Sequence, residues 1–418
     1  MKEADIRLPK ASLGSSAGQQ SLFRRALLSR LSGLSEGHLK VLEGREIVLD
    51  VGQRDAPAQI VRIQRSRAYR QMILGGPIGA AEAYMAGDWD TDDLVGLLRL
   101  FLANRAVLES LEGGLNLLQK PLRRLHHFFN RDTIAQSKKN IAAHYDLGND
   151  FFSLFLDPTM SYSAGVFKRD EDSMESASLN KFEHIGRQLA LCPDDRVIEI
   201  GTGWGGFAIY AAERFGCHVT TTTISDAQYA YAKKQIEERS LGNRITLLKD
   251  DYRELKGQYD KLVSIEMIEA VGLKYLPLFF ETCSRLLKPT GSLLIQAITI
   301  AESRFLAASR SVDFIQKYIF PGGALASAAE LVRVGSSAGF GLRCYGLEDL
   351  TSHYARTMRA WREAFFEQRG VMLSSGLSEN FLRMWAFYLA YCEAGFLERA
   401  TGLVHLRFHK PDFRETRS

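Results

Sequence analysis

The chain has 418 residues, of which 46% are hydrophobic and 24% charged, so it is long enough for two domains with a sizeable core. Its formal net charge of +4 permits contact with an anionic surface but does not indicate nucleic-acid binding. No stretch approaches the roughly 20 uninterrupted apolar residues of a membrane-spanning helix, and the five cysteines are scattered without a CxxC pair. We therefore expect a cytoplasmic protein with reduced thiols and no metal site.

The N-terminal part predicts a small α+β domain. Residues 1–20 lack the apolar core of a signal peptide and are expected to be a disordered lead-in. Leu and Phe recur with helical spacing over residues 21–42, and strands are expected at residues 46–49 and 59–65. The second strand and its flank form a basic edge, which is either a solvated face or an approach surface for anionic headgroups. The arginines of this edge are Arg62, Arg65, Arg67 and Arg70.

A second basic stretch closes this domain. Residues 115–129 mix apolar side chains with basic ones, among them Lys120, Arg123 and Arg124. The pattern is typical of a helix lying in a bilayer interface, or of a linker helix packed on its own protein. We place the N-terminal domain and its linker at residues 21–130 and a larger second domain at residues 131–418.

Strands and helices alternate in the second domain. This order predicts an α/β fold with a doubly wound, Rossmann-like parallel sheet, whose ligands bind beyond the carboxyl ends of the strands. The expected strands are residues 196–200, 217–223, 245–248, 259–265 and 291–299. The expected helices are residues 177–191, 226–239 and 273–286.

The first strand of this domain runs directly into a glycine-rich turn. Gly201, Gly203, Gly205 and Gly206 follow the strand, and an amphipathic stretch begins at Phe207. Glycine can adopt positive φ and lets the backbone press against a ligand. Because dinucleotide sites use similar turns, this turn alone leaves S-adenosylmethionine, a dinucleotide or no ligand open.

Several motifs together resemble one enzyme family. In order they are HYDLGNDFF (144–152), YSAGVF (162–167), EIGTGWGG (199–206), TISDAQ (223–228), DYREL (251–255), IEAVG (268–272), KYIFPGG (317–323) and YARTMRAW (354–361). The set resembles the cyclopropane-fatty-acyl-phospholipid synthases, S-adenosylmethionine-dependent methyltransferases that alkylate unsaturated acyl chains of phospholipids. The resemblance covers residues 134–409. Before it, YMAGDWD (84–90) more loosely resembles the lipid-binding domain of longer family members.

The resemblance implies positions for the cofactor. Gly201 and Gly203 would face the amino-acid portion of S-adenosylmethionine, and Ile224 and Gln228 would lie near its adenosine and ribose. Many methyltransferases place an acid after the second strand, but this chain has TTTTIS before its first acid, Asp226. A hydroxyl or an amide could replace that acid, or the stretch is simply a threonine-rich strand end.

The other implied cofactor residues come from two further motifs. Asp251 and Tyr252 would border the adenine. Tyr162 and Ser163 would close over the cofactor.

The family's chemistry calls for a base. An alkene is a poor nucleophile, so its methylation leaves a cation that must be shielded from water and then deprotonated. The resemblance implies that a bicarbonate ion serves as the base. The matching positions are Ala164, Glu269, Gln296, Ile298 and Tyr354.

Four positions depart from the family pattern. Ala164 replaces a cysteine, and Ala270 and Gln296 replace histidines. Glu266 stands where glycine is common, and two carboxyls three residues apart can raise each other's pKa. These changes leave alkylation plausible and make ring closure questionable.

The sequence therefore predicts an enzyme that methylates acyl-chain carbon, with cyclopropane formation first and methyl or methylene branching without a ring as the alternative. A lipid-surface binding protein without catalysis and a soluble small-molecule methyltransferase remain further hypotheses. We expect an unsaturated phospholipid at the membrane surface as partner, peripheral membrane association and a homodimer. The apolar run at residues 378–396 would line an acyl tunnel or pack as a helix against the sheet.

Overall fold

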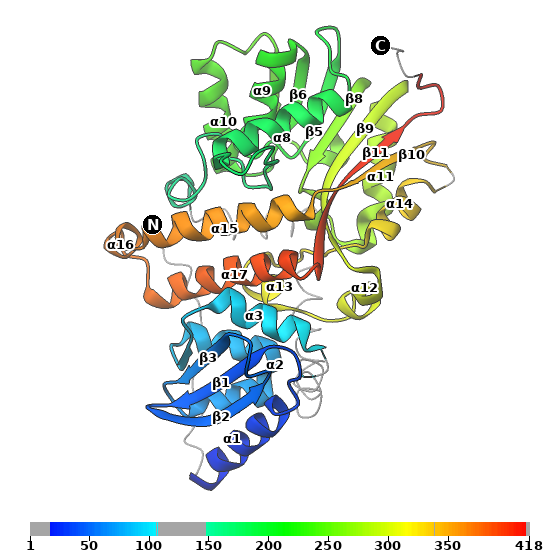
Figure 1. The fold of residues 1–418 in the computed structure, drawn as a ribbon. Helices are drawn as coiled ribbons and strands as arrows, with labels where there is room; N and C mark the ends of the chain where they lie inside the picture. Colours follow the sequence, from blue (N-terminus) through cyan, green and yellow to red (C-terminus); the bar gives the residue numbers. More distant parts are fainter. Residues whose placement is uncertain (1–16, 106, 108–147, 338, 415–418) are drawn as a thin grey trace. The chain divides into compact units, whose positions relative to one another are not determined.

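The computed structural model describes residues 17–105, 107, 148–337 and 339–414, which divide into two compact units (Figure 1). The first contains Met1–Phe129, Ser311–Ile319 and Trp361–Ala400, and the second contains Asn130–Arg310, Phe320–Ala360 and Thr401–Ser418. A single boundary at residue 130 does not anticipate the two later segments of the first unit. Most of the expected lead-in and the expected helix at 115–129 lie outside the described residues.

In the first unit, four described strands form a sheet in the order β2-β1-β3-β4, with β1 antiparallel to β2 and parallel to β3. The strands are β1 (His38–Glu43), β2 (Glu46–Gly52), β3 (Ala58–Ile63) and β4 (Trp89–Asp90). The helices include α1 (Ala17–Leu31), α2 (Arg67–Met85), α3 (Leu94–Ala103), α13 (Phe314–Tyr318), α16 (Arg369–Ser374) and α17 (Glu379–Leu397).

The helix expected over residues 21–42 is wrong in its second half. Helix α1 ends at Leu31, and the chain then turns through Gly37, which has a φ of +70°, into β1. Within β1, Leu39 and Val41 are buried on one face, so the apolar spacing at this point has the period of a strand.

The basic edge is largely neutralised. Arg62 pairs with Asp92, and Arg65 and Arg67 both pair with Asp88, whose side chain is fully buried. The solvated-face interpretation therefore fits these three arginines better than a surface of unpaired cations.

Helix α17 packs against α2 and α3 of the first unit. Its Phe387 contacts the rings of Tyr84 and Phe314. The expected packing against the parallel sheet is therefore wrong, and a role in an acyl tunnel stays a prediction. Among the described helices, none is both long and apolar enough to cross a bilayer.

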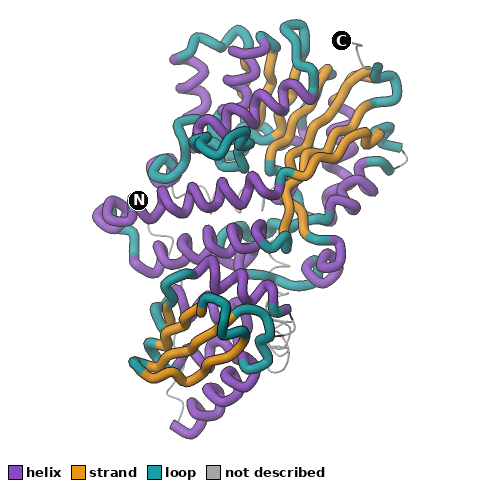
Figure 2. The backbone as a smooth tube through the Cα atoms, viewed as in Figure 1, coloured by secondary structure: helices purple, strands orange, loops and turns teal. Residues whose placement is uncertain are grey.

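In the described part of the second unit, seven strands form one sheet in the order β10-β11-β9-β8-β5-β6-β7 (Figure 2). Neighbours from β9 through β7 are parallel, whereas β11 runs antiparallel to both β9 and β10. The strands are β5 (Arg196–Ile200), β6 (His218–Thr222), β7 (Ile245–Leu248), β8 (Tyr259–Ile265), β9 (Leu287–Ile300), β10 (Arg343–Asp349) and β11 (Thr401–His409). The α/β, Rossmann-like fold is thereby confirmed.

Helices connect and cover these strands. They are α7 (Asn149–Phe152), α8 (Met174–Gln188), α9 (Gly206–Phe215), α10 (Asp226–Glu238), α11 (Leu276–Leu286), α12 (Glu302–Ala308) and α14 (Ala328–Gly335). Short 3-10 helices among the described residues are η2 (Tyr252–Glu254), η3 (Ile268–Ala270) and η4 (Leu273–Tyr275). Helix α15 (Thr351–Glu367) begins in the second unit and ends in the first.

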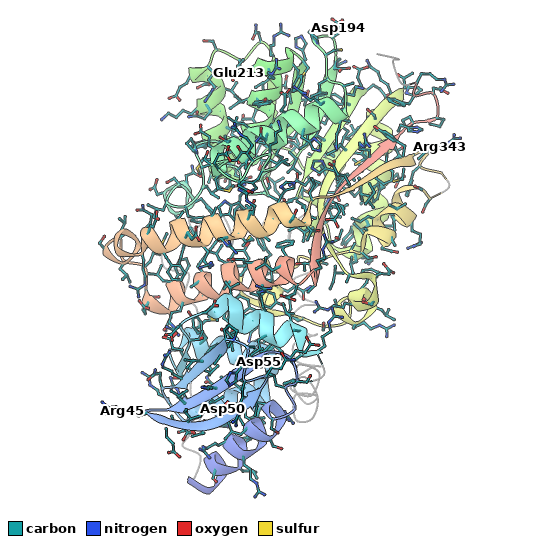
Figure 3. All side chains as sticks on the ribbon, viewed as in Figure 1. Arg45, Asp50, Asp55, Asp194, Glu213 and Arg343 are labelled. Atoms are coloured by element: carbon teal, nitrogen blue, oxygen red, sulfur yellow. The ribbon has the colours of Figure 1, made fainter. Side chains whose placement is uncertain are left out.

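The sheet of the second unit has an apolar core on each face. Val197 of β5 joins the core under α8 and α9, whereas its neighbour Ile198 joins the core under α11. This alternation is the period of two expected of a strand that is buried on both faces. Charged residues such as Asp194, Glu213 and Arg343 lie at the exposed periphery (Figure 3).

Replacing Phe280 tests this core, because its ring is fully buried between Phe279 and Phe408. Phe280→Ala should lower the free energy of unfolding by about 3–5 kcal/mol, as large cavities do. Leu278→Ala, on the same helix but 38% exposed, is the control and should change it by about 1 kcal/mol at most. Denaturant unfolding measures both, and equal effects would contradict this assignment of the core.

Candidate active site

The glycine turn joins β5 to α9 at the carboxyl edge of the sheet. The amides of Gly201 and Thr202 both donate to the carbonyl of Thr222 at the end of β6, at 3.2 and 3.0 Å. Gly201 and Gly203 have φ values of +103° and +53°, which L side chains rarely adopt. A Cβ at Gly201 would lie 3.2 Å from Met267, whereas one at Gly203 would meet no atom within 4 Å. The turn therefore leaves its backbone open at the N-terminus of α9, a suitable place for a carboxylate.

Beyond β6, the polar groups next to the turn are a hydroxyl and an amide. The Thr223 hydroxyl donates to Oε1 of Gln228 at 2.8 Å, and both side chains are buried. Asp226 is exposed and pairs with Lys249. Ile224 lies between β6 and α10. Thr223 and Gln228 are thus buried polar groups after β6, and their replacement of the usual acid stays a prediction.

Asp251 and Tyr252 follow β7 at the same edge of the sheet. The Asp251 carboxylate accepts from the Arg253 amide at 3.0 Å and from its guanidinium at 2.7 and 2.6 Å. The ring of Tyr252 contacts that of Phe279. The acid is therefore held rigidly by its own turn.

Tyr162 belongs to an aromatic cluster that reaches the glycine turn. Its ring lies 5.3 Å from that of Phe152, and Phe152 lies 5.2 Å from Trp204 of the turn. The indole of Trp204 donates to the Asn149 side chain at 2.8 Å. The segment around residue 162 and the described end of the first motif thus pack beside the turn.

Lys181 is a buried cation that the sequence analysis missed. Its ammonium donates to the hydroxyls of Ser161 and Ser163 at 2.6 and 2.7 Å. Burial lowers its pKa to about 8, and nearby carboxylates act in the opposite direction. Lys181 lies on the same helical face as the buried Ala177 and Ile185. A lysine on the apolar face of an amphipathic helix was the feature that could have identified it as a functional residue.

The centre of the site is the carboxylate of Glu266. Oε1 accepts from the Ala164 amide at 2.9 Å and from Nε2 of Gln296 at 2.7 Å, while Oε2 accepts from the Tyr354 hydroxyl at 2.5 Å. These donors come from the segment around residue 162, from β9 and from α15. Burial raises the pKa of Glu266, whereas the donors favour its charged form and oppose that rise.

The backbone at Glu266 explains why glycine suits this position. Its φ is +47°, in the left-handed region, and its amide donates to the carbonyl of Gln296 at 2.9 Å. An L residue in that conformation costs roughly 1–2 kcal/mol relative to the usual region. A strained acid with three donors on its carboxylate is the kind of exception found at functional sites.

A second carboxyl, that of Glu269, lies nearby. Its Oε1 accepts from the Ile298 amide at 2.6 Å, and its buried Oε2 has no hydrogen-bond partner among the described residues. Burial raises the pKa of Glu269 to about 8, and the charge of Glu266 adds to the rise. At neutral pH we therefore assign the proton of this pair to Glu269 and the negative charge to Glu266. Apolar side chains border a small cavity beside Glu269, among them Ile268, Leu273, Leu276, Ile298 and Leu331.

Of the five residues predicted to organise the base, Glu269 is one of these two carboxyls, and the other four donate to one of them: Ala164, Gln296, Ile298 and Tyr354. The sequence analysis gives Glu266 only as a departure from the family pattern. An acid at a position where glycine is common was the feature that could have identified it as a site residue. The roles of these residues in catalysis, and of the turn residues in cofactor binding, stay predictions.

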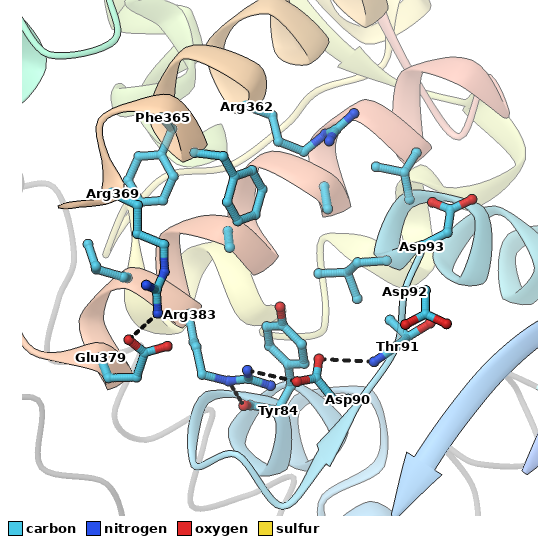
Figure 4. Close-up of a pocket in the computed structure, with 16 residues that line it drawn as sticks. Tyr84, Asp90, Thr91, Asp92, Asp93, Arg362, Phe365, Arg369, Glu379 and Arg383 are labelled. Atoms are coloured by element: carbon cyan, nitrogen blue, oxygen red, sulfur yellow. Dashed lines mark hydrogen bonds and ion pairs between the residues drawn. The ribbon is translucent and has the colours of Figure 1, made fainter. Parts of the chain in front are cut away.

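A separate pocket of about 340 Å³ lies within the first unit (Figure 4). Three arginines line it, and each is ion-paired. The pairs are Arg362–Glu393, Arg369–Glu379 and Arg383–Asp90. The pocket therefore offers no unpaired arginine to an anionic ligand, and we assign it no function.

The sheet and its glycine turn have the arrangement of a nucleotide- or S-adenosylmethionine-binding α/β enzyme. Comparison with known proteins makes the assignment specific: the family model described as mycolic acid cyclopropane synthetase matches residues 132–406. The chain belongs to this family.

Two relatives are similar over most of the chain. A tuberculostearic acid methyltransferase from Mycobacterium tuberculosis is 37% identical over 353 residues, which cover 82% of each chain. The cyclopropane-fatty-acyl-phospholipid synthase of Escherichia coli is 35% identical over 367 residues, covering 85% of this chain and 88% of the relative.

Two solved structures resemble about two thirds of the chain. The cyclopropane synthase MmaA2 from Mycobacterium tuberculosis superposes with a TM-score of 0.61 at 28% identity, covering 65% of this chain and 98% of that one. The same values hold for the mycolic acid cyclopropane synthase CmaA1 complexed with SAH and CTAB.

The open turn predicts a specific loss of cofactor binding. Gly201→Ala places a Cβ at a positive φ, which strains the turn, and 3.2 Å from the Met267 side chain, which must then give way. We expect affinity for S-adenosylhomocysteine to fall about tenfold, the equivalent of strain near 1.4 kcal/mol. Calorimetric titration measures it, with Gly242→Ala as control, since Gly242 lies in open space without positive φ. Equal affinities for the two variants would remove the turn from the cofactor site.

Proposed function

We propose that this enzyme transfers a methyl group to a double bond of an unsaturated phospholipid acyl chain, and that the Glu266 carboxylate takes up the proton released afterwards. The observation that carries this proposal is the set of three donors on one buried carboxylate beside the glycine turn. The printed names of the two relatives, both of lipid-modifying enzymes, support the acceptor class.

When bound, S-adenosylmethionine supplies an electrophilic methyl group. The alkene π electrons form the new carbon–carbon bond as the carbon–sulfur bond breaks, and the adjacent alkene carbon becomes a cation. The Glu266 anion, fixed by Ala164, Gln296 and Tyr354, stabilises that charge and then accepts a proton from the transferred methyl group. The acyl chain has then gained one CH2, and the proton resides on Glu266.

The residues do not fit a bicarbonate base. The donors expected to hold that ion, from Ala164, Gln296 and Tyr354, already bind the Glu266 carboxylate. We infer that Glu266 replaces the ion, so no step requires bicarbonate. A catalytic role as the base would explain why a glutamate occupies position 266, where the backbone conformation favours glycine.

The same proton transfer can give two products. If the methyl group is deprotonated at once, the ring closes. If a hydride first moves from the methylated carbon to the cationic carbon, the tertiary cation gives a methylene branch instead. Burial raises the pKa of Glu266 and its three hydrogen bonds oppose that rise, so its basicity does not choose between the two routes. Because the relative with 37% identity is named a methyltransferase, we propose a methylene-branched acyl chain, and the 35% identity to a cyclopropane synthase makes the ring the second candidate.

Labelled S-adenosylmethionine and vesicles of unsaturated phospholipid test the reaction. We expect label in the lipid, a mass gain of one CH2, and olefinic CH2 signals in the NMR spectrum of the acyl chain. Cyclopropane signals would select the second candidate. Label confined to water-soluble acceptors, or no transfer at all, would overturn the proposal.

The two carboxyls should respond differently to amidation. Glu266→Gln removes the base and should lower kcat by roughly 10²- to 10⁴-fold, with S-adenosylhomocysteine affinity unchanged. Glu269→Gln mimics the protonated acid assigned to that position and should cost less. The exposed Glu281→Gln is the control. A larger loss at Glu269 than at Glu266 would reverse the assignment of the base.

The rate should also depend on pH in a defined direction. Because burial raises the pKa of Glu266 above the usual 4.5, the ionised base is lost as pH falls through that raised value. Tyr354→Phe removes a donor to the anion, so the acid limb of kcat/KM should move to higher pH. Tyr345→Phe, on β10, is the control. An unmoved limb in Tyr354→Phe would contradict the proposed base.

A further inference from the structure

A buried histidine contacts Gln296 from the neighbouring strand. In the antiparallel register of β9 and β11, His405 is the direct partner of Gln296, and both residues are fully buried. Nε2 of His405 lies 2.8 Å from Oε1 of Gln296, whose Nε2 donates to Glu266 at 2.7 Å. The imidazole of His405 is thus connected to the Glu266 carboxylate through a single side chain, that of Gln296.

The direction of these hydrogen bonds follows from Glu266. A carboxylate only accepts, so the Gln296 amide must turn its NH2 group toward Glu266 and its oxygen toward His405. An amide oxygen also only accepts, so the hydrogen of a neutral His405 must be on Nε2. Nδ1 lies 3.1 Å from Oε1 of Gln188, whose Nε2 lies within hydrogen-bond distance of Glu348 and His184. Because an amide oxygen only accepts, the Nε2–H tautomer requires the Gln188 amide to be turned so that its NH2 group faces Nδ1, and we assign it that orientation.

The surroundings keep this imidazole neutral. Burial lowers its pKa to about 3, and neighbouring cationic groups add to that effect. The groups that face or surround it are Lys181 and His184 on α8, His353 on α15, Arg407 on β11 and Glu348 on β10, which pairs with His184. A single tautomer can therefore persist over the working pH range.

We propose that His405 is a positioning residue, whose Nε2–H holds the Gln296 amide so that its NH2 group, and not its oxygen, faces Glu266. The inference rests on the proposed role of Glu266 as base. Without His405 the amide can rotate by 180° and point its oxygen at the carboxylate, which removes one donor and adds a repulsive contact. The resemblance implies a histidine at position 296. In this chain Gln296 occupies that position, and the imidazole of His405 contacts the Gln296 side chain on the side away from Glu266.

A matched pair of variants tests this role. His405→Leu cannot donate, and we expect kcat to fall roughly 10- to 100-fold, the range for losing a hydrogen bond to a charged group. The acid limb of the pH profile should move to higher pH, because the Glu266 anion has lost a donor, while S-adenosylhomocysteine affinity stays unchanged. His405→Gln carries an amide NH2 near the position of Nε2. This variant should restore most of the rate, and the acid limb of its pH profile should lie at the wild-type pH.

The control is His409→Gln on the same strand, whose ring lies against Tyr345 and Phe413. Thermal unfolding of each variant shows whether it is folded. If His405→Leu and His405→Gln are equally impaired, or if the acid limb does not move in His405→Leu, the positioning role is wrong.

A measurement on the wild-type protein separates this inference from the proposed function. With 15N-labelled histidine, NMR should show His405 as the neutral Nε2–H tautomer at pH 7 and well below it. The spectrum should be unchanged by EDTA, although ligand atoms of His184, Glu348 and His405 lie within 4.8 Å of one another. The Nδ1–H tautomer, a protonated ring or an EDTA-dependent signal would overturn the inference. If the expected tautomer is seen but no lipid is labelled, the proposed function fails while the geometry of His405 stands.

Discussion

A single buried carboxylate, that of Glu266, to which we assign the negative charge of the site, is the constraint on which the site depends. Isolated charge in a protein interior is costly unless it is hydrogen-bonded. Here donors from three separate parts of the second unit converge on it. The acid also occupies a left-handed backbone conformation that would suit glycine better. Its retention there is understandable if its charge serves the reaction.

The sheet brings these groups together. Glu266 follows the last residue of β8, and its amide is bonded to β9, which also provides Gln296 and Ile298. Met267, one residue further on, would lie 3.2 Å from a Cβ added at Gly201 of the turn after β5. The glycine turn and Glu266 therefore share one edge of the sheet, where parallel α/β proteins bind their ligands.

Buried charge is divided within this site. We assign the proton to Glu269 because its carboxyl has one backbone donor, whereas Glu266 has three donors and lies within the field of the Lys181 ammonium. Two acids three residues apart thus acquire different states from their surroundings. The neutral His405 extends the ordered network behind Gln296 without adding a charge.

Much of the second unit could be predicted from the sequence, because its strands are short apolar runs and its glycine turn is local. The resemblance also brought together Ala164, Glu269, Gln296 and Tyr354, which lie far apart in the chain. Local patterns could not indicate that β11 pairs with β9, so the contact between His405 and Gln296 was missed.

The errors have the same origin. The end of α1 was misjudged because Leu and Val in β1 continued a helical spacing by chance. Nor could a linear reading of domains assign residues 361–400 to the first unit, since that assignment depends on packing against α2 and α3.

The most direct test of an internal base is the rate of methyl transfer to lipid vesicles after bicarbonate and carbon dioxide have been removed from the assay. A protein carboxylate needs no dissolved anion, so the rate should be the same with and without added bicarbonate. A rate that collapses on depletion and returns when bicarbonate is added would contradict the assignment of Glu266.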